Sequence, residues 1–257
     1  MTAGSWEWHH LAGPAGELHA DSAAAVASRF ADGASGQAVP PARRAVRVLD
    51  AARPAVVLGS AQRDGIVDRS RAAAAGVDVV RRASGGGAVL VGPRSTLWVD
   101  LVLPAGDPLW SDDVGRAAWW VGEAWREALV AGAGRWWPPT LGPPEVWPGP
   151  MVRTAWSDLV CFAGLGPGEV TAPGADGRPV KVVGVSQRRT KRGALFQCAA
   201  LLSWDPGALL DLLVLPQEKG GSGAAELADV AAPLDALDAP GRVELLDAFR
   251  AAVAAAR

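Results

Sequence analysis

The chain has 257 residues, of which 49% are hydrophobic and 20% are charged. This composition predicts a packed core and excludes wholesale disorder, and the length suits one large domain or a domain with a small appendage. The formal net charge of −2 creates no global attraction to nucleic acid or anionic lipid, so we expect neither as a partner.

The chain contains two cysteines and three histidines. These are too few for a disulfide framework and show no metal-ligand spacing, so no metal site is expected. No segment resembles a signal peptide, and no apolar run approaches the ~20 residues that cross a bilayer. We therefore expect a cytoplasmic protein that does not enter a membrane.

In the first part of the chain, helical patterns alternate with short β-type runs. A first helix is expected over residues 17–33, ending at Gly33, and a second between its N-cap Asp68 and its stop Gly76. Short strands are expected at 44–50, 55–60, 77–82, 88–91 and 96–104. The last two flank the turn sequence GPRS, which predicts a hairpin.

The clearest helical pattern starts at Ser111, a typical N-cap. Two aspartates follow in the first turn, where the helix dipole favours negative charge. Apolar residues then recur at helical spacing and predict the buried face. They are Val114, Ala117, Ala118, Val121, Ala124, Trp125, Ala128 and Leu129. Residues 132–150 are rich in glycine, proline and tryptophan and predict an ordered loop.

Further strands are expected at 157–163, 168–172, 179–187 and 193–204. The sequence GADG at 174–177 predicts a hairpin turn between the second and third of them. The polar stretch 217–223 precedes a helical tail. We therefore expect an α/β fold with a mixed, mainly antiparallel sheet and packed helices. Its main domain would span residues 1–215, and residues 216–257 would be a short C-terminal helical extension.

The stretch RRASGGGAV, residues 81–89, places a glycine run directly after two arginines. Without side chains in the way, the backbone N–H groups of Gly85–Gly87 can face a ligand, which suits a phosphate or an acyl carbonyl. The pattern is neither a Walker loop nor a dinucleotide-binding fingerprint. A glycine-rich turn beside solvated arginines remains the alternative.

The stretch KVVGVSQRR, residues 181–189, places Lys181 in an otherwise apolar β run. A lysine in a cleft there would suit a phosphate or an acyl carbonyl oxygen. The basic run at 188–192 is either a solvated face or a surface that steers an acidic protein partner. Cys161 is either a small buried hydrophobic residue or, with Lys181 nearby, a nucleophile.

Together, the two motifs resemble those of the lipoate–protein ligase and octanoyltransferase family, which is related to the biotin–protein ligases. The resemblance covers roughly residues 40–215. It implies a biotin/lipoate protein ligase-like domain in which Lys181 is the central active-site residue. It also implies a set of substrate-binding residues: Arg81, Arg82, Ser84, Gly85, Gly86, Gly87, Gly184 and Ser186.

The family divides by chemistry, and Cys161 resembles the nucleophile of the cysteine-dependent transferases. That resemblance implies transfer of an octanoyl or lipoyl group through an acyl-Cys161 thioester, with an acyl carrier protein as a possible donor. The acceptor would be a lysine of a lipoyl carrier domain, in an H protein or an E2 subunit. Lys181 would polarise the thioester carbonyl, and no cofactor would be tightly bound.

Two alternatives stay open. One is an ATP-dependent lipoate–protein ligase, in which Arg81, Arg82 and Lys181 hold a lipoyl-adenylate formed with ATP and Mg²⁺, and Cys161 is merely packed. The other is a non-catalytic homologue that binds acyl groups or lipoyl carrier domains.

Overall fold

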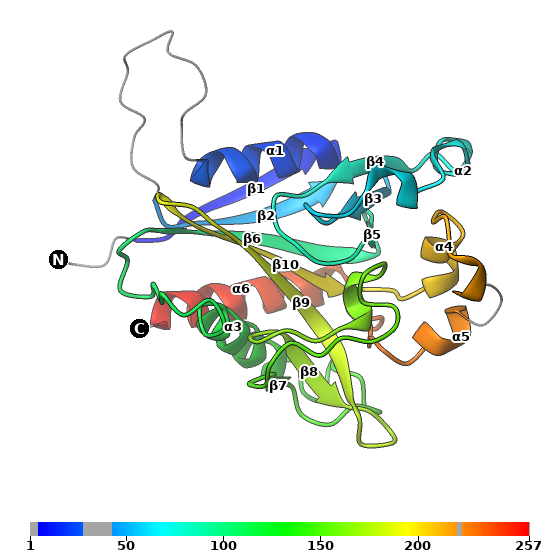
Figure 1. Cartoon of the computed structure of the whole chain (residues 1–257). Coiled ribbons are helices and arrows are strands. Elements are labelled where there is room, and N and C mark those ends of the chain that lie inside the picture. Colours follow the sequence, from blue (N-terminus) through cyan, green and yellow to red (C-terminus); the bar gives the residue numbers. More distant parts are fainter. Residues whose placement is uncertain (1–4, 28–42, 220–222, 257) are drawn as a thin grey trace, which may run out of the picture.

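The computed structural model describes residues 5–27, 43–219 and 223–256. Seven strands form a large sheet, shown in Figure 1. Their order is β1 (Glu7–Gly13), β2 (Ala45–Ala51), β6 (Thr96–Pro104), β10 (Gly193–Leu201), β9 (Pro179–Arg189), β8 (Val170–Pro173) and β7 (Glu145–Val146). β1 and β2 run parallel, and the other neighbouring pairs run antiparallel. The expected mixed, mainly antiparallel sheet is confirmed.

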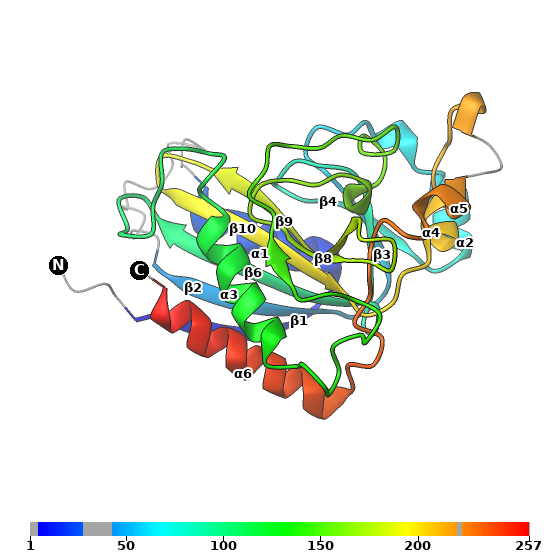
Figure 2. The ribbon, with the colours of Figure 1, turned by 90° about the horizontal axis from the view of Figure 1, so that it is seen from below.

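Helices cover both faces of the large sheet. α3 (Trp119–Val130) and α6 (Ala239–Ala255) lie side by side against one face, as Figure 2 shows, and α1 (Ala15–Val26) lies against the other. Trp125 of α3 and Phe249 of α6 are fully buried, with ring centroids 4.3 Å apart. Because both faces are covered, β6 is buried almost throughout, and its sequence shows no polar alternation.

A second, three-stranded sheet has the order β4 (Asp78–Arg81), β3 (Ala55–Leu58) and β5 (Val89–Val91). Short helices lie beside it: α2 (Arg69–Ala74), α4 (Pro206–Leu210) and α5 (Gly223–Leu227). α2 begins as expected, because the Asp68 carboxylate accepts the backbone N–H groups of Ser70 and Arg71. Gly76 follows it with a φ of 67°, the left-handed conformation that stops a helix.

The hairpin expected from residues 88–91 and 96–104 is wrong. β5 pairs with β3 in the small sheet, whereas β6 pairs with β2 and β10 in the large one. Residues 92–95 therefore cross from one sheet to the other. β6 occupies the middle of the large sheet with a partner on each side, which its local sequence does not reveal. The second expected hairpin is confirmed, since β8 and β9 pair across residues 174–178.

The helix expected from Ser111 begins only at Trp119. Residues 111–118 form turns, in which the Asp113 carboxylate accepts the backbone N–H of Gly115. This local bond competes with a regular helix start, and it leaves Val114 58% exposed rather than buried. The first helix runs from Ala15 to Val26, and its expected end at Gly33 lies outside the described residues.

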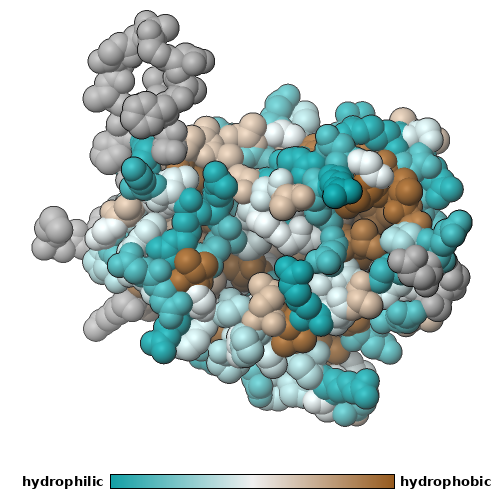
Figure 3. Space-filling model, in the orientation of Figure 1, coloured by the Kyte–Doolittle hydropathy of each residue, from teal (hydrophilic) through white to brown (hydrophobic). Residues whose placement is uncertain are grey.

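The strand expected at 157–163 is also wrong. Cys161–Ala163 is a single 3-10 turn, and Val160 makes only an isolated parallel bridge to Ala88. In the part of the chain that the structure describes, no helix is long and apolar enough to cross a membrane. Figure 3 shows a mainly hydrophilic face, with apolar surface gathered over the region of α2 and α4.

Candidate active site

A narrow apolar pocket lies between the large and the small sheet. The space between its atoms, open solvent at the entrance included, is about 430 Å³, of which only about 40 Å³ can hold the centre of a water molecule. It is lined by His19, Val57, Arg82, Val89, Val91, Trp98, Cys161, Phe162, Gly184, Val185, Ser186, Gln197, Cys198 and Ala199. The lining therefore combines residues from both sheets with Cys161 and three members of the lysine motif. An apolar pocket with few polar groups suits an aliphatic ligand.

The glycine loop is held in shape from within by Arg82. The buried Arg82 guanidinium donates hydrogen bonds to the carbonyls of Gly85 at 2.6 Å and Gly87 at 3.0 Å. Gly86 has a φ of 99°, which favours glycine. A Cβ at Gly87 would lie 2.6 Å from the carbonyl carbon of Val160, so this position requires glycine. Arg82 thus fixes the loop, and the loop packs closely against the segment that carries Cys161.

Cys161 is anchored by its backbone, while its sulfur lies at the pocket. Its N–H donates to the carbonyl of Ala88 at 2.9 Å. Its Sγ lies 3.7 Å from an Nη atom of Arg82, and the residue is partly exposed. Cys198, the other cysteine, is 1% exposed in the main core, and burial raises the pKa of its thiol. Only Cys161 therefore combines access with a neighbouring cation.

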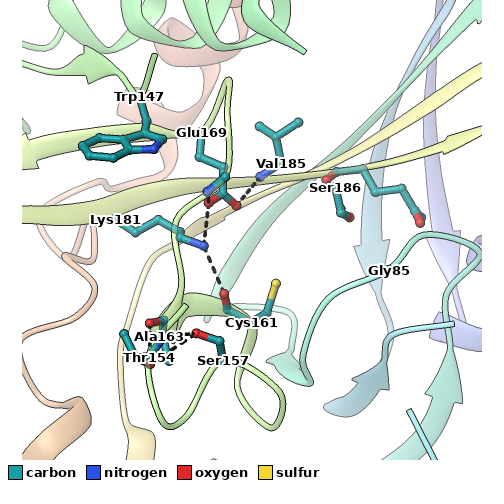
Figure 4. A network of polar contacts seen from close by, with 12 residues as sticks. Gly85, Trp147, Thr154, Ser157, Cys161, Ala163, Glu169, Lys181, Val185 and Ser186 are labelled. Carbon is teal, nitrogen blue, oxygen red and sulfur yellow. Dashed lines mark hydrogen bonds and ion pairs between the residues drawn. The ribbon is translucent and has the colours of Figure 1, made fainter. Parts of the chain in front are cut away.

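Lys181 is 1% exposed and lies directly beside Cys161. Its Nζ pairs with Oε2 of Glu169 at 2.8 Å and donates to the carbonyl oxygen of Cys161 at 3.0 Å, as Figure 4 shows. Glu169 also accepts the backbone N–H groups of Gly166 and Val185. In this arrangement Lys181 holds the backbone of Cys161, and the sulfur points away from the amine.

A chain of buried polar side chains borders the other side of the pocket. The Ser84 hydroxyl lies 2.8 Å from that of Ser186 and donates to Oε1 of Gln197 at 2.7 Å. Nε2 of Gln197 in turn lies 3.2 Å from the Asp100 carboxylate and 3.1 Å from Nδ1 of His19. This network of hydrogen-bonded side chains connects the glycine motif to the lysine motif and to α1.

The pKa values of the two titratable residues in this hydrogen-bonded network, Asp100 and His19, are strongly shifted. Burial raises the pKa of Asp100 to about 6, although hydrogen bonds from side chains including Trp98 and Gln197 oppose the shift. Burial and the charge of Arg82 lower the pKa of His19 to about 3. His19 is therefore neutral around pH 7, and Asp100 is mostly ionised.

The structure brings most of the expected site residues together. Arg82, Cys161, Gly184 and Ser186 line the pocket, and Lys181 is linked to it through Cys161. Arg81 turns away. It donates hydrogen bonds to the carbonyls of Gly59 and Gln62 and pairs with Asp64.

Sequence reasoning missed other residues of the site: His19, Trp98, Asp100, Glu169 and Gln197. Asp100 gave a signal, because it is a carboxylate inside an apolar β run. Within residues 5–27, 43–219 and 223–256, no cluster of three His, Cys, Asp or Glu side chains could hold a metal ion.

Residues 36–132 match the family model described as the lipoyl protein ligase A/B catalytic domain. A search of curated proteins finds no significant match. Solved structures match nearly the whole chain.

One of them comes from an archaeal lipoylation system, described as a bipartite lipoate protein ligase and its E2 lipoyl domain from Thermoplasma acidophilum. It shares 18% identity over 97% of this chain and 84% of that one, with a TM-score of 0.67. A second T. acidophilum protein, solved with bound lipoic acid, shares 17% identity over 98% and 86% of the two chains, with a TM-score of 0.59. A lipoate-protein ligase A bound with ATP shares 17% identity over 97% and 86%, with a TM-score of 0.64. These likenesses confirm the expected ligase-like fold.

Proposed function

We propose that this chain is a member of the lipoate–protein ligase and octanoyltransferase family and that it transfers an octanoyl or lipoyl group through Cys161 to a lipoyl carrier domain. The acceptor would be a lysine of an H protein or an E2 subunit. The T. acidophilum relative that is described with its E2 lipoyl domain supports a carrier of this kind. The relative with bound lipoic acid supports an acyl ligand.

One observation carries the choice of a thioester route. Cys161 lines an apolar pocket, and its Sγ lies 3.7 Å from the Arg82 guanidinium. An aliphatic chain can occupy the pocket while its carbonyl carbon reaches the sulfur. The fixed guanidinium can stabilise the negative charge that develops on sulfur, and it needs no rearrangement to do so.

The reaction would have two balanced steps. Sγ attacks the carbonyl of a thioester donor, a new C–S bond forms, and the donor's C–S bond breaks. The thiol proton of Cys161 leaves with the donor sulfur. The amine of the carrier lysine then attacks the acyl-Cys161 carbonyl, and an amide forms. The sulfur of Cys161 leaves and regains a proton from that amine.

In this scheme Lys181 would act first as a positioning residue. Its amine is paired with Glu169 and holds the carbonyl of Cys161, which fixes the backbone from which the sulfur projects. To polarise the thioester carbonyl directly, Lys181 would have to exchange one of these partners for the substrate.

The ATP-dependent ligase is the second candidate, and a solved relative bound with ATP favours it. In a ligase, Arg81, Arg82 and Lys181 would hold an adenylate phosphate. Here the three cations already bind internal acceptors: Arg81 binds Asp64, Arg82 binds carbonyls of the glycine loop, and Lys181 binds Glu169. Three engaged cations would each need a new arrangement to bind a phosphate, so the thioester route fits this geometry better.

The test is intact mass spectrometry after mixing the protein with octanoyl-acyl carrier protein, without ATP. We expect an octanoyl adduct that hydroxylamine removes. Cys161→Ala should lose the adduct, and Cys198→Ala, which removes the buried thiol, should keep it.

Two other outcomes would overturn the thioester route. Lipoylation of a carrier domain only after lipoate, ATP and Mg²⁺ are added, unaffected by Cys161→Ala, would establish the ligase. Acyl binding without transfer under either condition would establish the non-catalytic homologue.

A further inference from the structure

The floor of the pocket is a row of side chains set by strand register. Gly184 of β9 is paired with Ala199 of β10, which lies opposite Trp98 of β6, and Trp98 is in turn opposite Leu49 of β2. Residues directly opposite each other in neighbouring strands project from the same face of a sheet. The row therefore reads glycine, alanine, tryptophan, leucine. Two small residues leave space above the sheet, and then a large ring fills it.

Trp98 separates this pocket from a second hollow. The pocket is lined by Gly184, Ala199 and Trp98, whereas the hollow is lined by Leu49, Trp98 and Gly92. Val91 lines both. Trp98 therefore stands between the two spaces, at the end of the pocket that is farthest along the row from Gly184.

The Trp98 ring is held in this position. The side chain is 5% exposed, and its Nε1 donates to Oδ1 of Asp100 at 2.7 Å. The ring also packs against the His19 ring, with centroids 4.2 Å apart. A buried ring fixed by a carboxylate and by a second ring is a rigid wall and not a mobile side chain.

The distance along the row matches an acyl chain of medium length. The Phe162 ring, next to Cys161 in the chain, lies over Gly184. From Gly184 to Trp98 the row crosses two strand spacings, roughly 10 Å. Three bonds of an extended chain cover roughly 3.5 Å, so the seven C–C bonds of an octanoyl group cover roughly 8 Å.

We propose that Trp98 is the end wall of the acyl pocket and limits the straight-chain acyl group to about eight carbons. This inference rests on the proposed function, because it assumes that the acyl group enters beside Cys161. Removing the ring would free the space that the indole fills between the pocket and the narrow hollow beyond it, so the protein would accept longer chains.

The test measures binding of free straight-chain fatty acids of increasing length by calorimetry, which requires neither acylation of Cys161 nor turnover. For the unaltered protein, we expect the affinity to rise about fourfold with each methylene until the chain reaches Trp98, and then to fall. Trp98→Leu and the milder Trp98→Phe should move this limit to longer chains, the first by more carbons than the second.

Trp156 provides the matched control. It is also a buried tryptophan, and its Nε1 donates to a carboxylate, that of Glu226, at 2.7 Å, but it belongs to the core beneath the small sheet. Trp156→Phe should keep the original chain-length limit even where it destabilises the protein.

The same limit in the unaltered protein and in both folded Trp98 variants would overturn the inference. A chain-length limit that shifts in the Trp98 variants would support Trp98 as the end wall. If no acyl adduct forms on Cys161 in the same protein, the thioester route alone would be refuted.

Discussion

His19 should make the protein sensitive to mild acid, because the buried network holds its imidazole neutral. Oε1 of Gln197 accepts from Ser84, so the amide nitrogen of Gln197 faces Nδ1 of His19. Nδ1 must then accept a hydrogen bond, and the single proton of the neutral ring lies on Nε2. A second proton on Nδ1 would face the amide N–H group and add a positive charge near Arg82. The folded state therefore resists protonation of His19.

The size of the effect follows from the two pKa values. The pKa of His19 is about 3 in the folded protein against 6.5 for the unperturbed group. Below pH 6.5 the unfolded chain binds a proton that the folded protein excludes, so stability falls as the pH falls. Between pH 7 and pH 5 this costs about 2 kcal/mol of unfolding free energy, at about 1.4 kcal/mol per pH unit below the unfolded pKa.

Protonation of Asp100 changes the unfolding free energy in the opposite direction as the pH falls. Burial raises its pKa from 3.8 to about 6, so the unfolded chain releases this proton first as the pH rises. Its destabilising effect grows between those two values and is fully present above about pH 6. Lowering the pH from 7 to 5 therefore returns about 1 kcal/mol and partly masks the loss from His19.

The assay is urea unfolding of His19→Asn and the unaltered protein at pH 7, 6 and 5. Asparagine places an acceptor near the position of Nδ1 and cannot titrate. The variant will lose stability at every pH because the ring is gone. Between pH 7 and pH 5, however, the net loss of about 1 kcal/mol in the unaltered protein should become a net gain of about 1 kcal/mol in the variant, a difference of about 2 kcal/mol. The control is His10→Asn, because His10 is exposed on β1 and lies outside the buried network. Equal slopes for His19→Asn and the unaltered protein would refute the neutral, buried imidazole.

Two further predictions concern the residues that surround Cys161. Lys181→Met should cost about 3–5 kcal/mol of unfolding free energy, because it leaves the buried Glu169 carboxylate unpaired, and Lys181→Met with Glu169→Gln should recover most of that loss in urea unfolding. A double variant no more stable than the single one would contradict a paired, buried charge. Gly87→Ala should reduce the yield of acyl adduct in intact mass spectra, since its Cβ would meet the Val160 backbone at 2.6 Å. Gly65→Ala, outside the site and with no atom within 4 Å of the added Cβ, should keep it. Equal yields would mean that the loop shape does not govern Cys161.

Elements whose boundaries depend on local chemistry could be predicted from the sequence. Asp68 accepts two backbone N–H groups and Gly76 takes a left-handed conformation, so α2 forms where its caps require. The hairpin turn at 174–177 is local in the same sense. Apolar β runs carry less information, because a run buried on both faces does not identify its partner. That is why β5 and β6 could be taken for one hairpin although they belong to different sheets.

The residues of the site also differ in how well the sequence predicts them. The glycine loop and Lys181 were recognisable because each breaks the pattern of its surroundings. His19, Gln197 and Trp98 were not, because their proximity is set by where α1 lies on the sheet and by the register of β6 and β10. A histidine in a helix and a glutamine in a strand have no signal of their own until the fold places them together.

The choice between the two cysteines shows what the fold adds to the motif. Cys198 lies within β10, where its side chain enters the main core and burial raises the pKa of its thiol. Cys161 begins a single 3-10 turn, and three contacts from distant segments position it: the carbonyl of Ala88, the amine of Lys181 and the guanidinium of Arg82. Both motifs therefore converge on Cys161, whereas Cys198 lies opposite Val185 of the lysine motif with its thiol in the core. The convergence of two motifs on one accessible sulfur supports the proposal that Cys161 is a nucleophile. The strand position expected from the sequence does not support it, because the structure has no strand at Cys161.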